Sequence, residues 1–128
     1  MIAIEELKDK SETRIFKAVF PNTTNHYDTL FGGTALHLMD EASFICATRF
    51  SRKKMVTVST DKIDFSTPIP QGTIVELVAR VNKVGRTSCV VKVDIFMEDM
   101  YSYKREKAVT GFFTFVAVGE DKKPIAIM

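Results

Sequence analysis

The sequence contains no tryptophan, and cysteine and histidine occur only twice each. Cys46 and Cys89 lie in apolar stretches and form neither a CxxC redox motif nor the spacing of a zinc site. His26 and His37 also lack the spacing of metal ligands. We therefore expect reduced, buried thiols, a cytoplasmic location, and no metal or redox cofactor.

A strong excess of charge and long apolar runs are also missing. Lys and Arg number 18 against 16 Asp and Glu, and the net charge of +2 is too small to indicate nucleic acid. No run approaches the ~18 apolar residues of a membrane span. The first residues, MIAIEELKDK, mix acidic and basic side chains, unlike a signal peptide. We expect neither a nucleic acid nor a membrane as partner.

The chain does have the size and composition of one domain, residues 1–128, with 45% hydrophobic residues and a core of its own. A polar loop and a Gly-Gly pair separate a first apolar strand from one helix, and the remaining segments alternate with period 2. Strands segregated from a single helix predict the α+β class with an antiparallel sheet. The expected elements are a strand at 12–20, a helix at 34–50, and strands at 55–65, 73–84, 87–98 and 108–118.

The expected helix is apolar around nearly its whole circumference, which predicts burial on most sides within a sheet wrapped around it. Asp40 lies in its middle, between Leu36 and Phe44. Because a buried carboxylate costs several kcal/mol unless it is paired, Asp40 either has a chemical role or reaches solvent or a backbone partner at the helix edge. Glu41, about 100° away around the helix, is the competing candidate.

Gly32 and Gly33 precede the helix, where free N–H groups favour negative charge and permit close approach of a ligand. They form either an oxyanion hole or a plain helix entry. Asn25, in the loop before them, can donate and accept hydrogen bonds, so it orients a water or a carbonyl, or forms a turn. For His26 and His37 we expect surface or helper roles. No GxSxG nucleophile motif occurs.

The tetrapeptide Gly85-Arg86-Thr87-Ser88 lies between two expected strands. Its guanidinium, hydroxyl and backbone N–H groups suit phosphate or amide oxygens. The alternative is an ordinary hairpin with a solvated arginine. Other basic residues offer either phosphate ligands or a solvated surface, namely Arg52, Lys53, Lys54, Lys104, Arg105 and Lys107.

Taken as a set, these residues resemble the hotdog-fold acyl-CoA thioesterases, in particular the cytosolic acyl-CoA hydrolase group. The resemblance covers about residues 16–118 and rests on PNTTNHYDTLFGGTALHLMDEAS (21–43) and DKIDFSTPIPQGTIVELVARVNKVGRTS (61–88). The shared order is Asn, Gly-Gly, Met-Asp-Glu, Asp-Phe, Pro, Gly and Gly-Arg-Thr-Ser. Asp28 departs from it, because a small residue, often glycine, is expected there.

The resemblance implies the hotdog fold, in which a five-stranded antiparallel sheet wraps around one long central helix. It implies a homo-oligomer whose minimal unit is a dimer with a continuous sheet, assembling to a hexamer as a trimer of dimers. The implied reaction hydrolyses acyl-CoA to a carboxylic acid and CoA. Asp40 would act as base or nucleophile, beside Asn25 of the neighbouring subunit, and the Gly33 N–H would polarise the carbonyl. The residues implied to contact CoA are Gly85, Arg86, Thr87 and Ser88.

Three other functions compete with hydrolysis. A non-catalytic acyl-CoA sensor would keep the pocket without the base, and the presence of both Asn25 and Asp40 argues against it. A hotdog hydratase or dehydratase would use an Asp and a His, for which His37, one turn before Asp40, is the candidate. No residue pattern favours a purely structural assembly domain. The sequence leaves open the acyl chain length and the choice between CoA and an acyl carrier protein.

Overall fold

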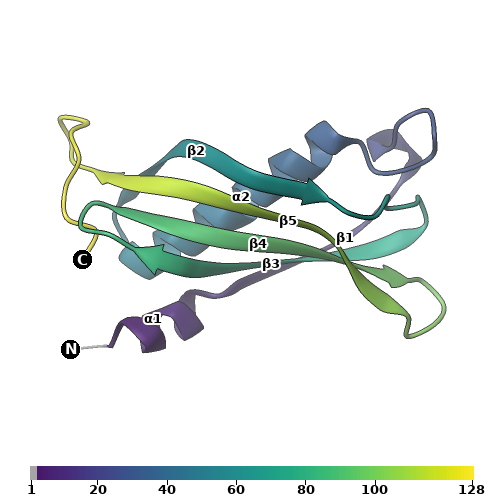
Figure 1. The fold of residues 1–128 in the computed structure, drawn as a ribbon, viewed down its shortest axis with the longest axis horizontal. Helices are drawn as coiled ribbons and strands as arrows, with labels where there is room; N and C mark the ends of the chain where they lie inside the picture. Colours follow the sequence, from purple (N-terminus) through teal and green to yellow (C-terminus); the bar gives the residue numbers. More distant parts are fainter. Residues whose placement is uncertain (1–2) are drawn as a thin grey trace.

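The computed structural model describes residues 3–128, and within them five antiparallel strands form one sheet. The order across the sheet is β1-β3-β4-β5-β2, so β1 and β2 are its edges (Figure 1). This arrangement confirms the predicted α+β class and the five-stranded antiparallel sheet. The strands are β1 (Thr13–Ala18), β2 (Lys54–Phe65), β3 (Thr73–Val84), β4 (Ser88–Asp99) and β5 (Arg105–Val118).

The long helix α2 (Gly32–Ser51) lies across one face of the sheet (Figure 1). It contains no proline, and good helix formers such as Ala, Leu and Met dominate it. It ends where Arg52 adopts the left-handed conformation, with φ 61°, and donates its N–H to the carbonyl oxygen of Thr48 at 2.6 Å. None of the helices in residues 3–128 is long and apolar enough to cross a membrane.

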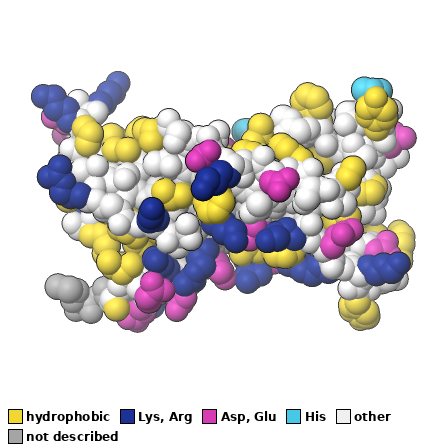
Figure 2. All heavy atoms as spheres, viewed as in Figure 1, with side chains coloured by type: hydrophobic (Ala, Val, Ile, Leu, Met, Phe, Trp, Pro, Cys, Tyr) yellow, Lys and Arg dark blue, Asp and Glu magenta, His cyan; other side chains and the backbone are white. Residues whose placement is uncertain are grey.

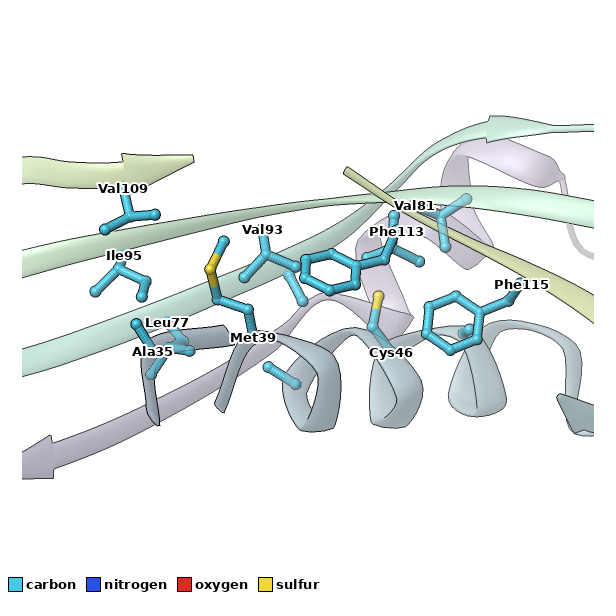
Figure 3. Packing of buried hydrophobic residues seen from close by; sticks show 14 of the residues in the cluster. Ala35, Met39, Cys46, Leu77, Val81, Val93, Ile95, Val109, Phe113 and Phe115 are labelled. Atoms are coloured by element: carbon cyan, nitrogen blue, oxygen red, sulfur yellow. The ribbon is translucent and has the colours of Figure 1, made fainter. Parts of the chain in front are cut away.

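The core lies between α2 and the inner face of the sheet. Met39 and Cys46 of α2 point toward Val93, Phe113 and Phe115 of the central strands, and all five side chains are at most 1% exposed (Figure 3). The alternating burial of β4 and β5 follows from the period of 2 in their sequences. Burying each such large side chain contributes about 1.5–3 kcal/mol, so this layer fixes how α2 lies on the sheet.

The sheet covers only one face of α2 in the single chain. Leu36 and Phe44 remain 37% and 45% exposed, so the predicted burial of the helix on most sides is wrong for one subunit. The physical reason is that one sheet touches one side of a cylinder about 10–12 Å wide. The buried face consists of Ala35, Met39, Ala42, Ser43, Cys46, Ala47 and Phe50.

The helix α1 (Ile4–Ser11) is absent from the predicted elements. Its sequence is mostly polar, and its residues contact residues that lie far away along the chain. Arg80 of β3 pairs with Asp9 at 2.8 Å, and Arg49 of α2 donates to the carbonyl oxygen of Lys10 at 2.9 Å. These partners lie far along the chain, so a local pattern does not reveal the helix.

The edge strand β2 carries an irregularity within residues 61–64, where its register with β5 shifts. Lys62 has φ 52° there, and the neighbouring Ile63 packs against the core. A Cβ on Gly111 of β5 would collide with Cδ1 of Ile63, so this glycine makes room for it. The irregularity therefore points one apolar side chain of the edge strand inward beside Met39.

The outer face of the sheet carries positive and negative side chains intermixed (Figure 2). At its centre the carboxylate of Glu76, only 4% exposed, accepts hydrogen bonds from Arg14 at 3.2 Å and from Arg105 at 2.5 Å. The Arg105 guanidinium also lies 4.3 Å from the ring centroid of Phe96. Two cations thus compensate the burial of one carboxylate.

Candidate active site

Asn25 lies in the loop between a short 3-10 helix, η1 (Pro21–Thr23), and α2. Its Oδ1 accepts hydrogen bonds from the N–H of Tyr27 at 2.9 Å, and from the N–H and hydroxyl of Thr29 at 3.3 and 3.1 Å. The Asn25 N–H donates to the carbonyl oxygen of Thr29 at 2.8 Å. The carbonyl end of the side chain therefore shapes the loop, and the Nδ2 amide is the end left to face a ligand.

Asp28, in the same loop, has φ 61°. Glycine adopts this left-handed conformation freely, and aspartate is among the other residues that tolerate it. The backbone is held on both sides. The Asp28 N–H donates to the backbone carbonyl oxygen of Asn25 at 3.1 Å, and the Asp28 carbonyl oxygen accepts from the Gln71 N–H at 2.9 Å. The departure from the expected glycine therefore changes the side chain and keeps the path of the loop.

Gly32 and Gly33 are the first two residues of α2, where backbone N–H groups have no acceptor within the helix. A Cβ on Gly33 would lie 2.8 Å from Cε1 of Phe31, so the glycine lets this ring pack against the helix start. A cleft of about 190 Å³ opens beside it, with a mostly apolar lining: Leu30, Gly32, Ala35, Phe65, Thr67, Pro68, Ile69 and Val109.

A larger hollow of about 600 Å³ lies elsewhere, where Thr73, Met97 and Arg105 form part of its wall. Its wall includes Lys104 and Arg105, two of the basic residues that could hold phosphate, but none of Asn25, Gly33, Asp40 and Gly85–Ser88. The cleft at the helix start is smaller. Gly32 of the predicted Gly-Gly pair lines it, whereas Asn25, Gly33 and Asp40 do not. Its position at the helix start, rather than its volume, is therefore what connects it with the candidate site.

Asp40 lies on the side of α2 that faces the edge strand β2. The hydroxyl of Thr57 donates a hydrogen bond of 3.1 Å to its Oδ1. Leu36 and Phe44 flank it one turn away on either side, and Phe44 lies 6.4 Å from Phe115 between ring centroids. Asp40 is thus a half-buried carboxylate on an apolar surface, held by one hydroxyl donor.

The other titratable candidates are more exposed. Glu41 and His37 are exposed on α2, and His26 is exposed in the loop with its ring 3.9 Å from that of Tyr27. Among residues 3–128, no hydrogen bond or ion pair joins either histidine to Asp40. Of the two adjacent carboxylates, Asp40 is the one with a side-chain partner among the residues that the structure describes.

Asn25 and Asp40 do not meet within one chain. Asn25 is engaged in its own loop, whereas Asp40 contacts Thr57 of β2. The helical rise from Gly32 to Asp40 is about 12 Å at 1.5 Å per residue. Within residues 3–128 no hydrogen bond joins the two side chains.

The Gly85–Ser88 segment forms the turn between β3 and β4, closed by a hydrogen bond of 2.7 Å from the Gly85 N–H to the Ser88 carbonyl oxygen. The Arg86 side chain is exposed, and Thr87 is half-buried. The turn lies at the end of the molecule where α2 ends, opposite to the Gly32 end (Figure 1). One chain thus holds the glycine pair and the predicted CoA-binding turn at opposite ends.

Thr57 is a candidate site residue that sequence reasoning misses. It is one of several polar residues that alternate along β2, and no motif distinguishes it. Its role becomes visible only through the packing of α2 beside the edge strand, which brings its hydroxyl to Asp40. The spacing of Thr57 from Asn25 and Asp40, which is also found in a related protein described below, is a second indication that it belongs to the candidate site.

The profile of the thioesterase superfamily matches residues 27–103. The chain is 39% identical over 118 residues to the uncharacterized acyl-CoA thioester hydrolase YkhA of Bacillus subtilis, a match that covers 91% of this chain and 69% of that protein. It is 35% identical to protein VdlD of Helicobacter pylori over 91% of this chain. The chain spans 66% of the length of VdlD.

Solved structures of similar proteins have the same fold over most of this chain. The acyl-CoA hydrolase of Staphylococcus aureus, solved with butyryl-CoA, CoA and CoA disulfide, gives a TM-score of 0.89 at 37% identity, over 93% of this chain and 73% of that one. A hexameric acyl-CoA thioesterase gives 0.90 at 34% identity, over 93% and 76% of the two chains.

The Staphylococcus aureus enzyme has also been solved with an asparagine, an aspartate or a threonine changed to alanine. In that enzyme the aspartate follows the asparagine by 15 residues, and the threonine follows the aspartate by 17. Asn25, Asp40 and Thr57 have the same spacing here. The profile match and the identity to YkhA establish that the chain belongs to the thioesterase superfamily and, within it, to the acyl-CoA thioester hydrolases.

Proposed function

We propose that this protein hydrolyses the thioester of acyl-CoA to a carboxylic acid and free CoA, with Asp40 as its base or nucleophile. The observation that carries the proposal is the Asp40 carboxylate, held by the Thr57 hydroxyl at 3.1 Å on an apolar surface. The equal spacing of Asn25, Asp40 and Thr57 with residues altered in a butyryl-CoA-binding relative supports the assignment.

Thioester hydrolysis needs a base and donors for the developing oxyanion. As a base, Asp40 removes a proton from water while the water oxygen attacks the carbonyl carbon. As a nucleophile, Asp40 attacks that carbon itself, and water then hydrolyses the resulting anhydride. In both routes the C–S bond breaks, and the CoA sulfur leaves as a thiolate and takes up a proton.

The helix start is suited to the oxyanion. The Gly33 N–H lies in the first turn of a 20-residue helix, where the dipole favours negative charge. Removal of one such donor from an oxyanion hole typically lowers the rate by about 10²–10³. The Nδ2 amide of Asn25 adds a neutral donor that orients the carbonyl or the attacking water.

A dimer through the β2 edge would complete this site. β2 has β5 as its one neighbour within residues 3–128, and an unpaired edge is open to another strand. Val56 and Val58 of this strand are 44% and 54% exposed, and Leu36 and Phe44 of α2 are 37% and 45% exposed. A two-fold axis there would give each dimer two equal sites, each with Asp40 of one subunit and Asn25 of the partner subunit.

The test is the release of free thiol from acyl-CoAs of short to long chain. We expect turnover by the wild type and a loss of at least about a hundredfold in Asp40→Ala, because the base or nucleophile is gone. Glu41→Gln, the adjacent exposed carboxylate, is the matched control and should retain activity. Tight binding of acyl-CoA without turnover would contradict hydrolysis and indicate a sensor.

The two roles of Asp40 are separable by isotope labelling. A single turnover in H₂¹⁸O labels the Asp40 carboxylate if Asp40 attacks as a nucleophile and water then opens the anhydride at the Asp40 carbonyl. If Asp40 acts as a base, only the released acid is labelled, and the same holds for an anhydride opened at the acyl carbonyl. Label in the peptide that contains Asp40, detected by mass spectrometry, therefore establishes the nucleophilic route.

A further inference from the structure

The chain after β5 folds back onto the end of the sheet. Val118 and Pro124 form an isolated antiparallel bridge, and the Ile125 N–H donates to the carbonyl oxygen of Ala117 at 2.9 Å. The segment then runs beside the turn between β3 and β4 (yellow in Figure 1). Residues 124–128 therefore lie against the turn predicted to contact CoA.

Ile127 connects this turn to the end of α2. Its side chain is 1% exposed, so it is a fully buried anchor. Its N–H donates to the carbonyl oxygen of Arg86 at 2.9 Å, and its own carbonyl oxygen accepts from the Ser51 hydroxyl at 2.6 Å. One residue thus ties the turn to the last residue of α2 through two hydrogen bonds.

Ala126, the residue before Ile127, binds the side chain of Lys53. The Lys53 ammonium donates to the carbonyl oxygen of Ala126 at 2.7 Å. An ammonium has three donors, so two remain for another ligand. Ile127 bonds the backbone carbonyl oxygen of Arg86, and Ala126 bonds the ammonium of Lys53, so the segment fixes the backbone of one cationic residue and the charged group of another at one end of the molecule.

We propose that residues 124–128 form a strap that positions the Gly85–Ser88 turn for the phosphate groups of CoA, and that Lys53 is a further phosphate-binding residue beside it. The proposal rests on the proposed function. Phosphate oxygens favour several positively charged and hydroxyl donors in one place, which Arg86, Lys53 and Thr87 supply. Ile127 acts through Arg86 and is a positioning residue.

The test compares two substrates with the same acyl group, acyl-CoA and acyl-pantetheine, which lacks the nucleotide and its phosphates. We expect Ile127→Ala and Lys53→Met each to raise KM for acyl-CoA about tenfold, with kcat nearly unchanged. KM for acyl-pantetheine should not change. Lys53→Arg, which keeps the cation, should restore most of the affinity for acyl-CoA.

Ile95→Ala is the matched control, because Ile95 is also a fully buried isoleucine but lies on β4 away from the strap. It should lower stability without distinguishing the two substrates. Equal losses with both substrates in Ile127→Ala and Lys53→Met would show a merely structural role and overturn the proposal. If Ile127→Ala does not fold, Ser51→Ala, which removes only the 2.6 Å hydrogen bond, takes its place with the same expected outcome.

Arg86→Ala separates failure of the strap from failure of the proposed site. A selective rise in KM for acyl-CoA in Arg86→Ala, without one in Ile127→Ala and Lys53→Met, would overturn the strap and leave the CoA-binding turn in place. No selective effect in Arg86→Ala would remove the CoA role of the turn itself. If none of these three substitutions changes thiol release, the proposed role of Asp40 in hydrolysis still stands.

Discussion

The hydroxyl of Thr57 on β2 donates a hydrogen bond of 3.1 Å to Oδ1 of Asp40 on α2. This bond fixes one carboxylate oxygen, and in the proposed reaction the other is left for water or the carbonyl carbon. We expect Thr57→Val, which keeps the side-chain shape without the donor, to lower kcat about tenfold, since hydrogen bonds to charged groups are among the stronger ones. Steady-state thiol release measures the effect.

Thr57→Ser is the control for this change, because it retains a hydroxyl at the same position. It should keep kcat within a few-fold of the wild type. A Thr57→Val variant with unchanged kcat would mean that Asp40 needs no orientation by β2. The thermal midpoint of both variants should stay near that of the wild type, since Thr57→Val removes one side-chain hydrogen bond and Thr57→Ser keeps it.

A second prediction concerns the composition of the site. If Asn25 and Asp40 belong to different subunits, co-expression of Asn25→Ala with Asp40→Ala creates heterodimers in which one site carries both changes and the other carries neither. Random pairing then restores about a quarter of the wild-type activity in the mixture, and about half in the purified heterodimer, where one site of two is intact. Each variant alone should be nearly inactive, and thiol release from the tagged, co-purified heterodimer is the measurement.

The same experiment distinguishes the opposite arrangement. If both residues came from one chain, every site in the mixture would carry one of the two changes, and no activity would return. A co-expression of Asp40→Ala with Thr57→Val provides the matched control, because both lie in one subunit. That mixture should contain only the residual activity of the parent variants.

The sequence predicts the sheet better than the site. The strand at 73–84 agrees residue for residue, because Gly72 and Gly85 limit a segment that alternates with period 2. The helix prediction differs from Gly32–Ser51 by two residues at the start and one at the end. Such local patterns decide where elements begin and end.

Relations between elements are less visible in the sequence. The bond between Asp40 and Thr57 depends on how α2 lies beside an edge strand, and no local pattern encodes it. The exposure of Leu36 and Phe44 likewise depends on how much of the helix one sheet can cover. A pattern of apolar residues marks a surface for burial without saying whether its own chain or a second copy covers it.

A third prediction follows from the left-handed conformation of Asp28. A β-branched residue is strained there, so Asp28→Val should lower the free energy of unfolding by about 1–2 kcal/mol. Asp28→Gly should stay within about 1 kcal/mol, because relief of strain is offset by a more flexible unfolded chain. Urea unfolding of the three proteins checks the order, and equal stability of Asp28→Val and Asp28→Gly would contradict it.

The buried thiols make a fourth prediction, about pH. Burial raises the pKa of Cys46 to about 11 and that of Cys89 to about 12. In the unfolded chain both thiols ionise near their ordinary pKa of about 8.5. Between these values the folded protein binds more protons than the unfolded one, so stability is fully present below about pH 8.5 and falls as pH rises toward 11–12.

Urea unfolding at pH 7, 8.5 and 10 measures this loss, with Cys46→Ala/Cys89→Ala as the matched variant. Lysine and tyrosine side chains also titrate near pH 10, and both proteins share that contribution. The wild type should therefore lose more stability than the variant between pH 8.5 and 10. Parallel curves would mean that the thiols ionise equally in the folded and unfolded chain. In the folded enzyme the two thiols, 0% and 1% exposed, should stay unreactive toward the reagent that detects released CoA.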